Sequence, residues 1–277
     1  KEDRISKEKE KNKAGEDIDF PGWDKLDAEV NQVKPRSIIE IRDSENNLID
    51  RFSGTYKKGF NRVSWGLTQN LSVNKIAGAS GFNYPLRINV PPGEYSFNVF
   101  TVENDNISKI GSKFFNVKKI NDSYLDNPQK ELDVNSFYSE ILNVVDNYKK
   151  HNHTLTKIKD GIKVLLGIMN TSAVDNINDK YNQYIKLREL INSCEVYLNG
   201  NKSKKDIREK DFQSIGDRLS VAIRGVNSSY GFTKMHKESL GKAAILVEKY
   251  GEMLDNIKKE YVVLKNSFNQ EIIDSVD

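Results

Sequence analysis

The three histidines are the residues best suited to hold a metal ion. His151 and His153 form a His-x-His pair, and His236 is the only other histidine. On a strand, such a pair would point both imidazoles at one metal ion. The surrounding apolar spacing is helical instead, and residues two apart on a helix face about 200° away from each other. We therefore interpret His151 as a core histidine and His153 as a surface histidine, and we expect no metal site.

Several carboxylates lie at the ends of predicted strands, where glycoside hydrolysis would need two of them. That reaction requires carboxyl groups about 5 to 10 Å apart across a cleft. Charged side chains at strand ends more often keep hairpins soluble, so we predict no catalytic residue among them. The carboxylates in question are Asp43, Glu45, Asp50, Glu94 and Glu103.

The remaining candidates for chemistry are aromatic residues and one thiol. Trp65 and Tyr95 could stack on a sugar if they were exposed, but alternation with polar neighbours favours a core position. Cys194 is the only cysteine, which excludes an intramolecular disulfide and a cysteine pair for zinc or redox chemistry. The sequence also lacks a P-loop, a Gly-x-Gly-x-x-Gly fingerprint, a nucleophile elbow and a His-Glu-x-x-His motif. We therefore predict no enzymatic activity and no cofactor for this segment.

Charge and hydropathy exclude two classes of partner. The net charge is +3, with 20 basic and 17 acidic residues up to residue 120 and 23 of each after it. Binding to nucleic acid needs a concentrated cationic face, which such mixed charge does not provide. No run of about 18 apolar residues could cross a bilayer. We expect neither nucleic-acid binding nor membrane insertion.

Period-two patterns from residue 37 onward predict the strands that would position the aromatic residues. Ile39 and Ile41 alternate with charged neighbours, residues 44–47 turn the chain, and 48–52 return, which predicts a hairpin. Further strands are predicted over 60–67, 94–102 and 113–117, with a long Asn-, Gly- and Ser-rich loop over 68–90.

Helical periodicity replaces this pattern after Asp133. One seam steps by four and three residues through Phe137, Ile141, Val144, Tyr148, His151, Leu155, Ile158, Ile162, Leu165 and Met169. Further helices are predicted over 174–198, ending at Asn199-Gly200, over 205–223, and from 240 to 272. The short connections predict antiparallel neighbours. The charged segment before Pro35 is predicted to be a solvated arm with a short helical piece over 24–33.

The predicted fold class is therefore multidomain, all-β plus all-α. An Ig-like antiparallel β-sandwich over 37–120 follows a charged N-terminal arm or linker over 1–36. An antiparallel three- to four-helix bundle occupies 121–277.

Several stretches of the chain resemble a known family. In the first half these are Phe20-Pro21-Gly22-Trp23-Asp24-Lys25-Leu26-Asp27-Ala28-Glu29, Ile41-Arg42-Asp43-Ser44-Glu45-Asn46-Asn47-Leu48-Ile49, Lys58-Gly59-Phe60-Asn61-Arg62-Val63-Ser64-Trp65, Tyr84-Pro85-Leu86 and Pro92-Gly93-Glu94-Tyr95. In the second half they are Ser214-Ile215-Gly216-Asp217-Arg218-Leu219 and Ser228-Ser229-Tyr230-Gly231-Phe232-Thr233. These stretches are similar to the C-terminal region of bacterial sortilin-like, BNR-repeat β-propeller proteins of Bacteroidota, which are often labelled glycosyl hydrolases. Gly66 and Phe232 depart from that family's usual residues, Asp and Pro.

This resemblance implies that the segment follows a large propeller in an exported protein of the periplasm, outer membrane or cell surface. Any hydrolytic site would belong to that propeller. The chain starts at Lys1 without a methionine, so we expect upstream sequence. The expected partners are the upstream propeller or another exported protein.

The leading functional hypothesis is a non-catalytic accessory segment that acts as a docking or spacer module through protein–protein interaction. One alternative is that the 68–90 loop, with Asn70, Asn74 and Asn83, completes a glycosidase or peptidase site formed with the propeller. A second alternative is an oligomeric coiled-coil adhesin, because heptad seams also serve intermolecular coiled coils.

Overall fold

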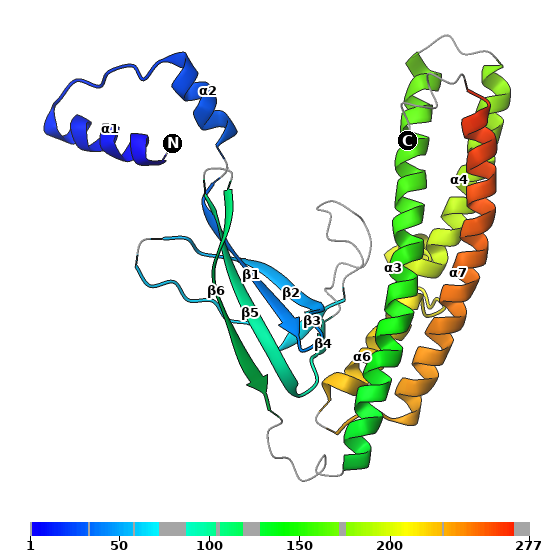
Figure 1. The fold of residues 1–277 in the computed structure, drawn as a ribbon. Coiled ribbons are helices and arrows are strands. Elements are labelled where there is room, and N and C mark those ends of the chain that lie inside the picture. Colours follow the sequence, from blue (N-terminus) through cyan, green and yellow to red (C-terminus); the bar gives the residue numbers. More distant parts are fainter. Residues whose placement is uncertain are drawn as a thin grey trace. The chain divides into compact units, whose positions relative to one another are not determined.

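A computed structural model of the protein divides into two compact units (Figure 1). One unit comprises Lys1–Thr68 and Pro91–Lys118, and the other comprises Gln69–Val90 and Lys119–Asp277. The structure describes residues 2–32, 34–57, 59–71, 87–103, 106–118, 128–171, 176–228 and 230–268. The sequence analysis placed one boundary between the strands and the helices, at residues 120 and 121. The two units are not separated by one boundary, because the segment 69–90 belongs with the helices.

The first unit contains a four-stranded antiparallel sheet in the order β2-β1-β5-β6. Its strands are β1 (Arg36–Asp43), β2 (Leu48–Gly54), β5 (Gly93–Glu103) and β6 (Asn106–Val117). The predicted hairpin around 44–47 is confirmed, since β1 pairs with β2 and the Asp43 carboxylate accepts hydrogen bonds from the backbone N–H groups of Glu45 and Asn47. The strand predicted over 94–102 is confirmed as β5.

The register of this sheet gathers apolar side chains on one face. Ile39 lies opposite Val99 and Ile41 lies opposite Phe97 across the β1–β5 pair. Trp65 packs on this face, with its ring centroid 6.0 Å from that of Tyr95 and 6.0 Å from that of Phe115. The strand predicted over 60–67 is wrong, because the segment runs as irregular chain. The Trp65 indole N–H instead donates to the carbonyl of Thr68.

The predicted fold class, an Ig-like β-sandwich followed by a bundle, is wrong as well. The described residues form seven helices, the four-stranded sheet and a separate two-stranded sheet, and the structure is about 59% helical. A sandwich needs two sheets whose inner faces cover each other. The segment that would have supplied a further strand packs Trp65 on the sheet as irregular chain, and the two-stranded sheet lies mostly within the helical unit.

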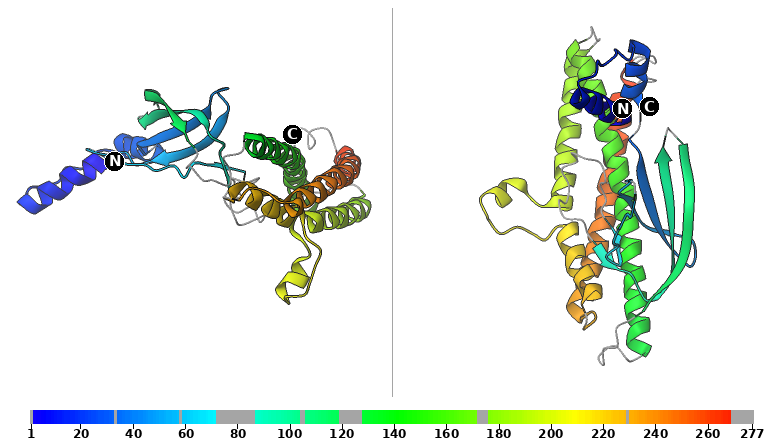
Figure 2. Two further views of the ribbon diagram at one scale, coloured as in Figure 1. Left: turned by 90° about the horizontal axis from the view of Figure 1, so that it is seen from below. Right: turned by 90° about the vertical axis from the view of Figure 1, so that its left-hand side faces the viewer.

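The second unit is built from long helices that share one apolar core. They are α3 (Pro128–Thr171), α4 (Ile177–Asn199), α6 (Ile215–Asn227) and α7 (Lys234–Asn266). Both α3 and α7 extend along the unit, and α4 and α6 lie beside successive parts of α7 (Figures 1 and 2). Gly200 ends α4 with a φ of 74°, a conformation that favours glycine, as the sequence predicts.

The core-facing side of α3 follows the predicted seam with two shifts. Val145 is fully buried while Val144 is half-buried, and Asn152 is buried while His151 is half-buried. Adjacent helix positions differ by about 100°, so either residue of such a pair can lie near the centre of a broad interface. Spacing alone therefore identifies this helix without fixing every core position.

The segment between the two parts of the first unit adds strands to the helical unit. β3 (Thr68–Asn70) pairs with β4 (Arg87–Asn89). Leu71 and Ile88 are 1% and 0% exposed and belong to the same core as the helices. The side chain of Asn227 in α6 accepts a hydrogen bond from the Asn89 N–H at 2.8 Å and donates one to the Arg87 carbonyl at 2.9 Å. The ends of the predicted 68–90 loop are thus part of a packed structure.

The single helix predicted over 205–223 is wrong, because two helices occupy that stretch. The short α5 (Lys202–Asp206) ends before Arg208, which takes a φ of 59°. A capping box then begins α6, in which the Ser214 hydroxyl accepts from the Asp217 N–H and the Asp217 carboxylate accepts from the Ser214 N–H. These local interactions outweigh the continuous apolar period. The intervening segment with α5 protrudes from the helices (Figure 2).

The N-terminal arm forms two short helices, α1 (Glu2–Ala14) and α2 (Trp23–Asn31). No described residue of either helix is buried. Phe20 and Trp23 pack edge to face with ring centroids 5.1 Å apart, yet they are 62% and 73% exposed. Polar contacts therefore dominate the folding of this arm.

Candidate functional site

The structure separates the three histidines. His151 on α3 is half-buried, and its ring lies edge-on to Tyr250 at 5.8 Å, whereas His153 is exposed. Burial lowers the pKa of His151, the charge of Lys258 adds to that effect, and Asp255 opposes it. His236 accepts a hydrogen bond from the Thr233 N–H at the start of α7. No group of three or more His, Cys, Asp or Glu side chains that could hold a metal occurs in the described ranges.

Two of the candidate carboxylates lie close together, since the Asn47 side-chain amide donates to both Asp43, at 3.0 Å, and Glu45, at 3.4 Å. Asp43 is bound within its hairpin turn, and Asp50 is buried with its carboxylate accepting from the Arg51 N–H. Glu94 and Glu103 lie at opposite ends of β5, nine residues apart, which corresponds to about 30 Å along a strand. Asp43 and Glu45 are therefore bound to groups of their own turn, and Glu94 and Glu103 are too far apart to act on one glycosidic bond.

One acidic and two basic side chains of β1 and β2 form a partly buried cluster instead. The Glu40 carboxylate accepts from the guanidinium groups of Arg42 at 2.9 Å and Arg51 at 2.5 Å. Burial alone would raise the pKa of Glu40, but these hydrogen bonds together lower it below its usual value. The group is a closed ion-pair cluster with a structural role. Sequence reasoning missed it because the three residues come from two strands.

Trp65 and Tyr95 come together in an aromatic cluster with Phe97 and Phe115. Tyr95 is only 4% exposed, its hydroxyl donates to the Pro91 carbonyl at 2.8 Å, and burial raises its pKa to about 12. Tyr95 and Phe115 are stacked, and Trp65 lies edge-on to Phe115, so the cluster supports the sheet by packing.

Cys194 is fully buried in the helical core. Burial, followed by the charge of Glu195, raises the pKa of its thiol to about 12. A protonated, enclosed thiol is a poor nucleophile. The nearby Tyr250 hydroxyl is also buried, and burial raises its pKa. These side chains fill the core of the bundle.

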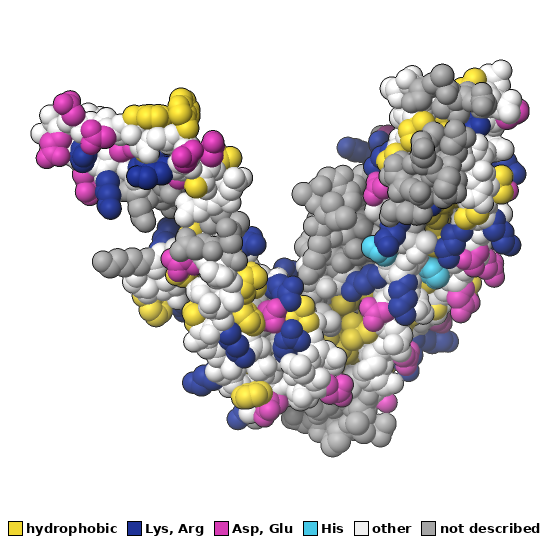
Figure 3. Space-filling view, turned by 45° about the horizontal axis from the view of Figure 1, so that its top comes forward, with side chains coloured by type: hydrophobic (Ala, Val, Ile, Leu, Met, Phe, Trp, Pro, Cys, Tyr) yellow, Lys and Arg dark blue, Asp and Glu magenta, His cyan; other side chains and the backbone are white. Residues whose placement is uncertain are grey.

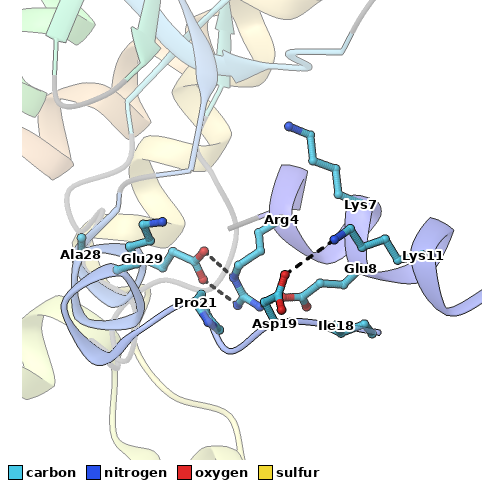
Figure 4. A pocket seen from close by; sticks show the side chains of 10 residues that line it. Arg4, Lys7, Glu8, Lys11, Ile18, Asp19, Pro21, Ala28 and Glu29 are labelled. Carbon is cyan, nitrogen blue, oxygen red and sulfur yellow. Dashed lines mark hydrogen bonds and ion pairs between the residues drawn. The ribbon is translucent and has the colours of Figure 1, made fainter. Parts of the chain in front are cut away.

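A crevice of about 500 Å³ lies between α1 and α2 (Figure 4). Its central cation, Arg4, donates to both carboxylate oxygens of Glu29, at 2.6 and 2.7 Å, and to Glu8 at 2.6 Å. These hydrogen bonds raise the pKa of Arg4. A guanidinium that is already bound to two carboxylates has little capacity for an anionic ligand. The ion pairs in this crevice therefore hold α1 and α2 of the arm together.

The sheet has two edge strands among the described residues, and β6 is the longer of them. This strand has 12 residues and is exposed at ten of its positions, and among the described strands it pairs with β5 alone. Ile107, Ile110 and Phe114 are 68%, 63% and 69% exposed. A long edge strand offers a row of backbone donors and acceptors to another extended chain. Exposed hydrophobic side chains of the sheet unit lie among lysine and arginine side chains in Figure 3.

The sequence analysis placed this strand only over 113–117. The cause is a register shift in the β5–β6 pair at Val99/Phe100, where Val99 faces Gly111 and Phe100 faces Lys109. Ile110 is therefore an extra residue on β6. The bulge breaks the alternation of apolar and polar residues, which was the only signal of a strand before residue 113.

Of the loop residues considered for an active site, Asn70 lies in β3 and is half-buried. Asn74 and Asn83 lie outside the described residues. Gln69, next to Asn70, accepts a hydrogen bond from the Tyr138 hydroxyl at 2.6 Å. The described end of the loop thus packs with α3.

Comparisons of the chain with protein-family models, with curated proteins and with solved structures return no match. The resemblance to sortilin-like propeller proteins therefore stays a prediction from its motifs. Among the helices that the structure describes, none is both long and apolar enough to cross a bilayer.

Proposed function

We propose that this segment is a non-catalytic docking and spacer module of an exported protein. The sheet unit docks a protein partner at the β6 edge, and the helical unit serves as the spacer. The observation that carries this proposal is the open, 12-residue edge strand with three exposed large apolar side chains. Exposed apolar groups beside unpaired backbone donors and acceptors are typical of protein-binding strands.

The dimensions of the helices support the role of a spacer. α3 has 44 residues, which at about 1.5 Å per residue corresponds to about 66 Å. Its core contacts include Phe137 near one end and Met169 near the other. Packing along most of this length makes the unit stiff, so it can hold a docking site away from the rest of a larger protein.

The proposed setting is the C-terminal part of a sortilin-like propeller protein at the periplasm, outer membrane or cell surface. It rests on the sequence motifs alone. In this setting, the propeller would hold any ligand pocket, and the present segment would connect it to a partner.

A turnover screen of the purified chain against glycoside and peptide substrates tests the non-catalytic part of the proposal. We expect no turnover above the buffer rate. Turnover that disappears when one carboxylate is replaced, for example in Glu94→Gln or Glu103→Gln, would contradict it. Both side chains are exposed, so neither change should affect folding.

A further inference from the structure

The side chains of β6 are sorted by the pairing register. Ile107 lies opposite Val102, and Phe114 lies opposite Ser96. Val102 and Ser96 are six residues apart on β5, so Ile107 and Phe114 point to the same face of the sheet. Lys113 lies opposite Phe97 and points to the other face, whereas Lys109 lies opposite Phe100 and shares the face of Ile107 and Phe114. An added strand would therefore meet a lysine on each face, and two large apolar side chains on one of them.

The charge of this edge has a single sign. β6 contains Lys109 and Lys113 and no acidic residue, and Lys118 follows it. Lys109 and Lys113 are exposed, and neither forms an ion pair within the part of the chain that the structure describes. Like charges on neighbouring strands are destabilising, whereas opposite charges contribute favourably.

This pattern discriminates between two occupants of the edge. A second copy of the chain, pairing β6 with β6, would bring four lysines onto one ladder without a carboxylate. An extended acidic segment would instead place carboxylates near these lysines. Lysines on an edge strand oppose self-association while they leave the backbone available.

We infer that β6 binds an acidic, extended peptide segment of a partner protein by strand addition. The inference rests on the proposed docking function and adds the binding mode and the chemistry of the partner. Backbone hydrogen bonds along β6 supply much of the affinity, and the lysines supply the preference for acidic side chains.

The test is a titration of the ¹⁵N-labelled full chain with two synthetic peptides, one alternating Val and Glu and the other alternating Val and Lys. We expect the Val/Glu peptide to slow hydrogen exchange at alternate β6 amides and to bind at least about tenfold more tightly than the Val/Lys peptide. The double variant Lys109→Glu/Lys113→Glu should reverse this preference.

A matched control is Lys163→Glu/Lys234→Glu, which changes the net charge equally on exposed positions of α3 and α7. This variant should keep the preference for the Val/Glu peptide. Circular dichroism verifies that each variant is folded.

Three results would overturn the inference. The first is equal affinity for both peptides, and the second is binding that does not slow hydrogen exchange in β6. The third is slower exchange in β6 when the concentration of the protein alone is raised, without peptide. The last result would assign the edge to a second copy. None of these results bears on turnover. The turnover screen therefore tests the non-catalytic part of the proposed function separately.

Discussion

Individual glycines determine how closely two helices of the second unit approach. A Cβ atom on Gly225 in α6 would lie 2.8 Å from the His236 ring and 2.9 Å from the Cβ of Phe232. A Cβ atom on Gly241 in α7 would meet nothing within 4 Å. Gly225 therefore allows close packing, whereas Gly241 has no packing role.

We expect Gly225→Ala to lower the free energy of unfolding by about 1 to 3 kcal/mol through overpacking. The matched change Gly241→Ala should raise it by up to about 1 kcal/mol, because alanine favours helix more than glycine. Urea unfolding followed by circular dichroism measures both values. Equal effects of the two changes would show that Gly225 does not limit the approach of α6 and α7.

The Glu40 cluster makes the sheet unit sensitive to acid. The folded pKa of Glu40 lies below its unfolded value, so its stabilisation is present above the unfolded pKa and is lost as the pH falls through the folded pKa. Glu40→Gln should reduce stability at pH 7 by about 1 to 3 kcal/mol and should flatten the loss of stability on acidification. Thermal unfolding between neutral and acidic pH tests this. Glu94→Gln, at an exposed position, is the matched control and should change stability at pH 7 by less than about 0.5 kcal/mol.

At the scale of elements, β3 and β4 stabilise the helices although they are distant in sequence. Ile88 is fully buried in the helical core. We expect Ile88→Ala to destabilise the helical unit by about 2 to 5 kcal/mol, measured as loss of hydrogen-exchange protection in α6 and α7. Ile245→Ala on α7, where the side chain is 64% exposed, should change stability by less than about 0.5 kcal/mol. Similar effects of both changes would contradict the assignment of β4 to this core.

Sequence patterns predicted most elements but not their assembly. The seam from Phe137 to Met169 identified α3, and alternation around Tyr95 identified β5. The bulge at Ile110 concealed half of β6, and the Ser214 capping box divided a helix that apolar spacing alone joined. Alternation over 60–67 was mistaken for a strand because an irregular segment that packs an aromatic ring on a sheet shows the same pattern.

For the candidate site, the sequence analysis correctly described Cys194 as unpaired and identified Trp65 and Tyr95 as packed residues. It did not predict the docking edge, because strand order decides which strand is outermost. That order depends on long-range pairing between β1 and β5, which local patterns do not contain.

At the scale of the whole molecule, the chain passes between the two units three times, after Thr68, after Val90 and after Lys118. A fragment over 119–277 therefore lacks Leu71 and Ile88, which complete the helical core. We expect this fragment to unfold at a lower temperature than the helical unit of the full chain, in a calorimetric comparison. An unchanged unfolding temperature would show that the helices are stable without the inserted segment.

The charge of β6 also predicts the state of association. Lysines at an open edge oppose pairing between copies, so light scattering should give the mass of a monomer, close to 31.7 kDa. A stable oligomer in which β6 is not protected from hydrogen exchange would favour the alternative of a coiled-coil adhesin.

The most direct test of the docking account is residue-resolved hydrogen exchange of the free, full-length chain. An open edge predicts that alternate amides of β6, those directed away from β5, exchange rapidly while their neighbours are protected. Uniform protection along Asn106–Val117 would mean that the edge is already occupied, and it would contradict the proposed docking site.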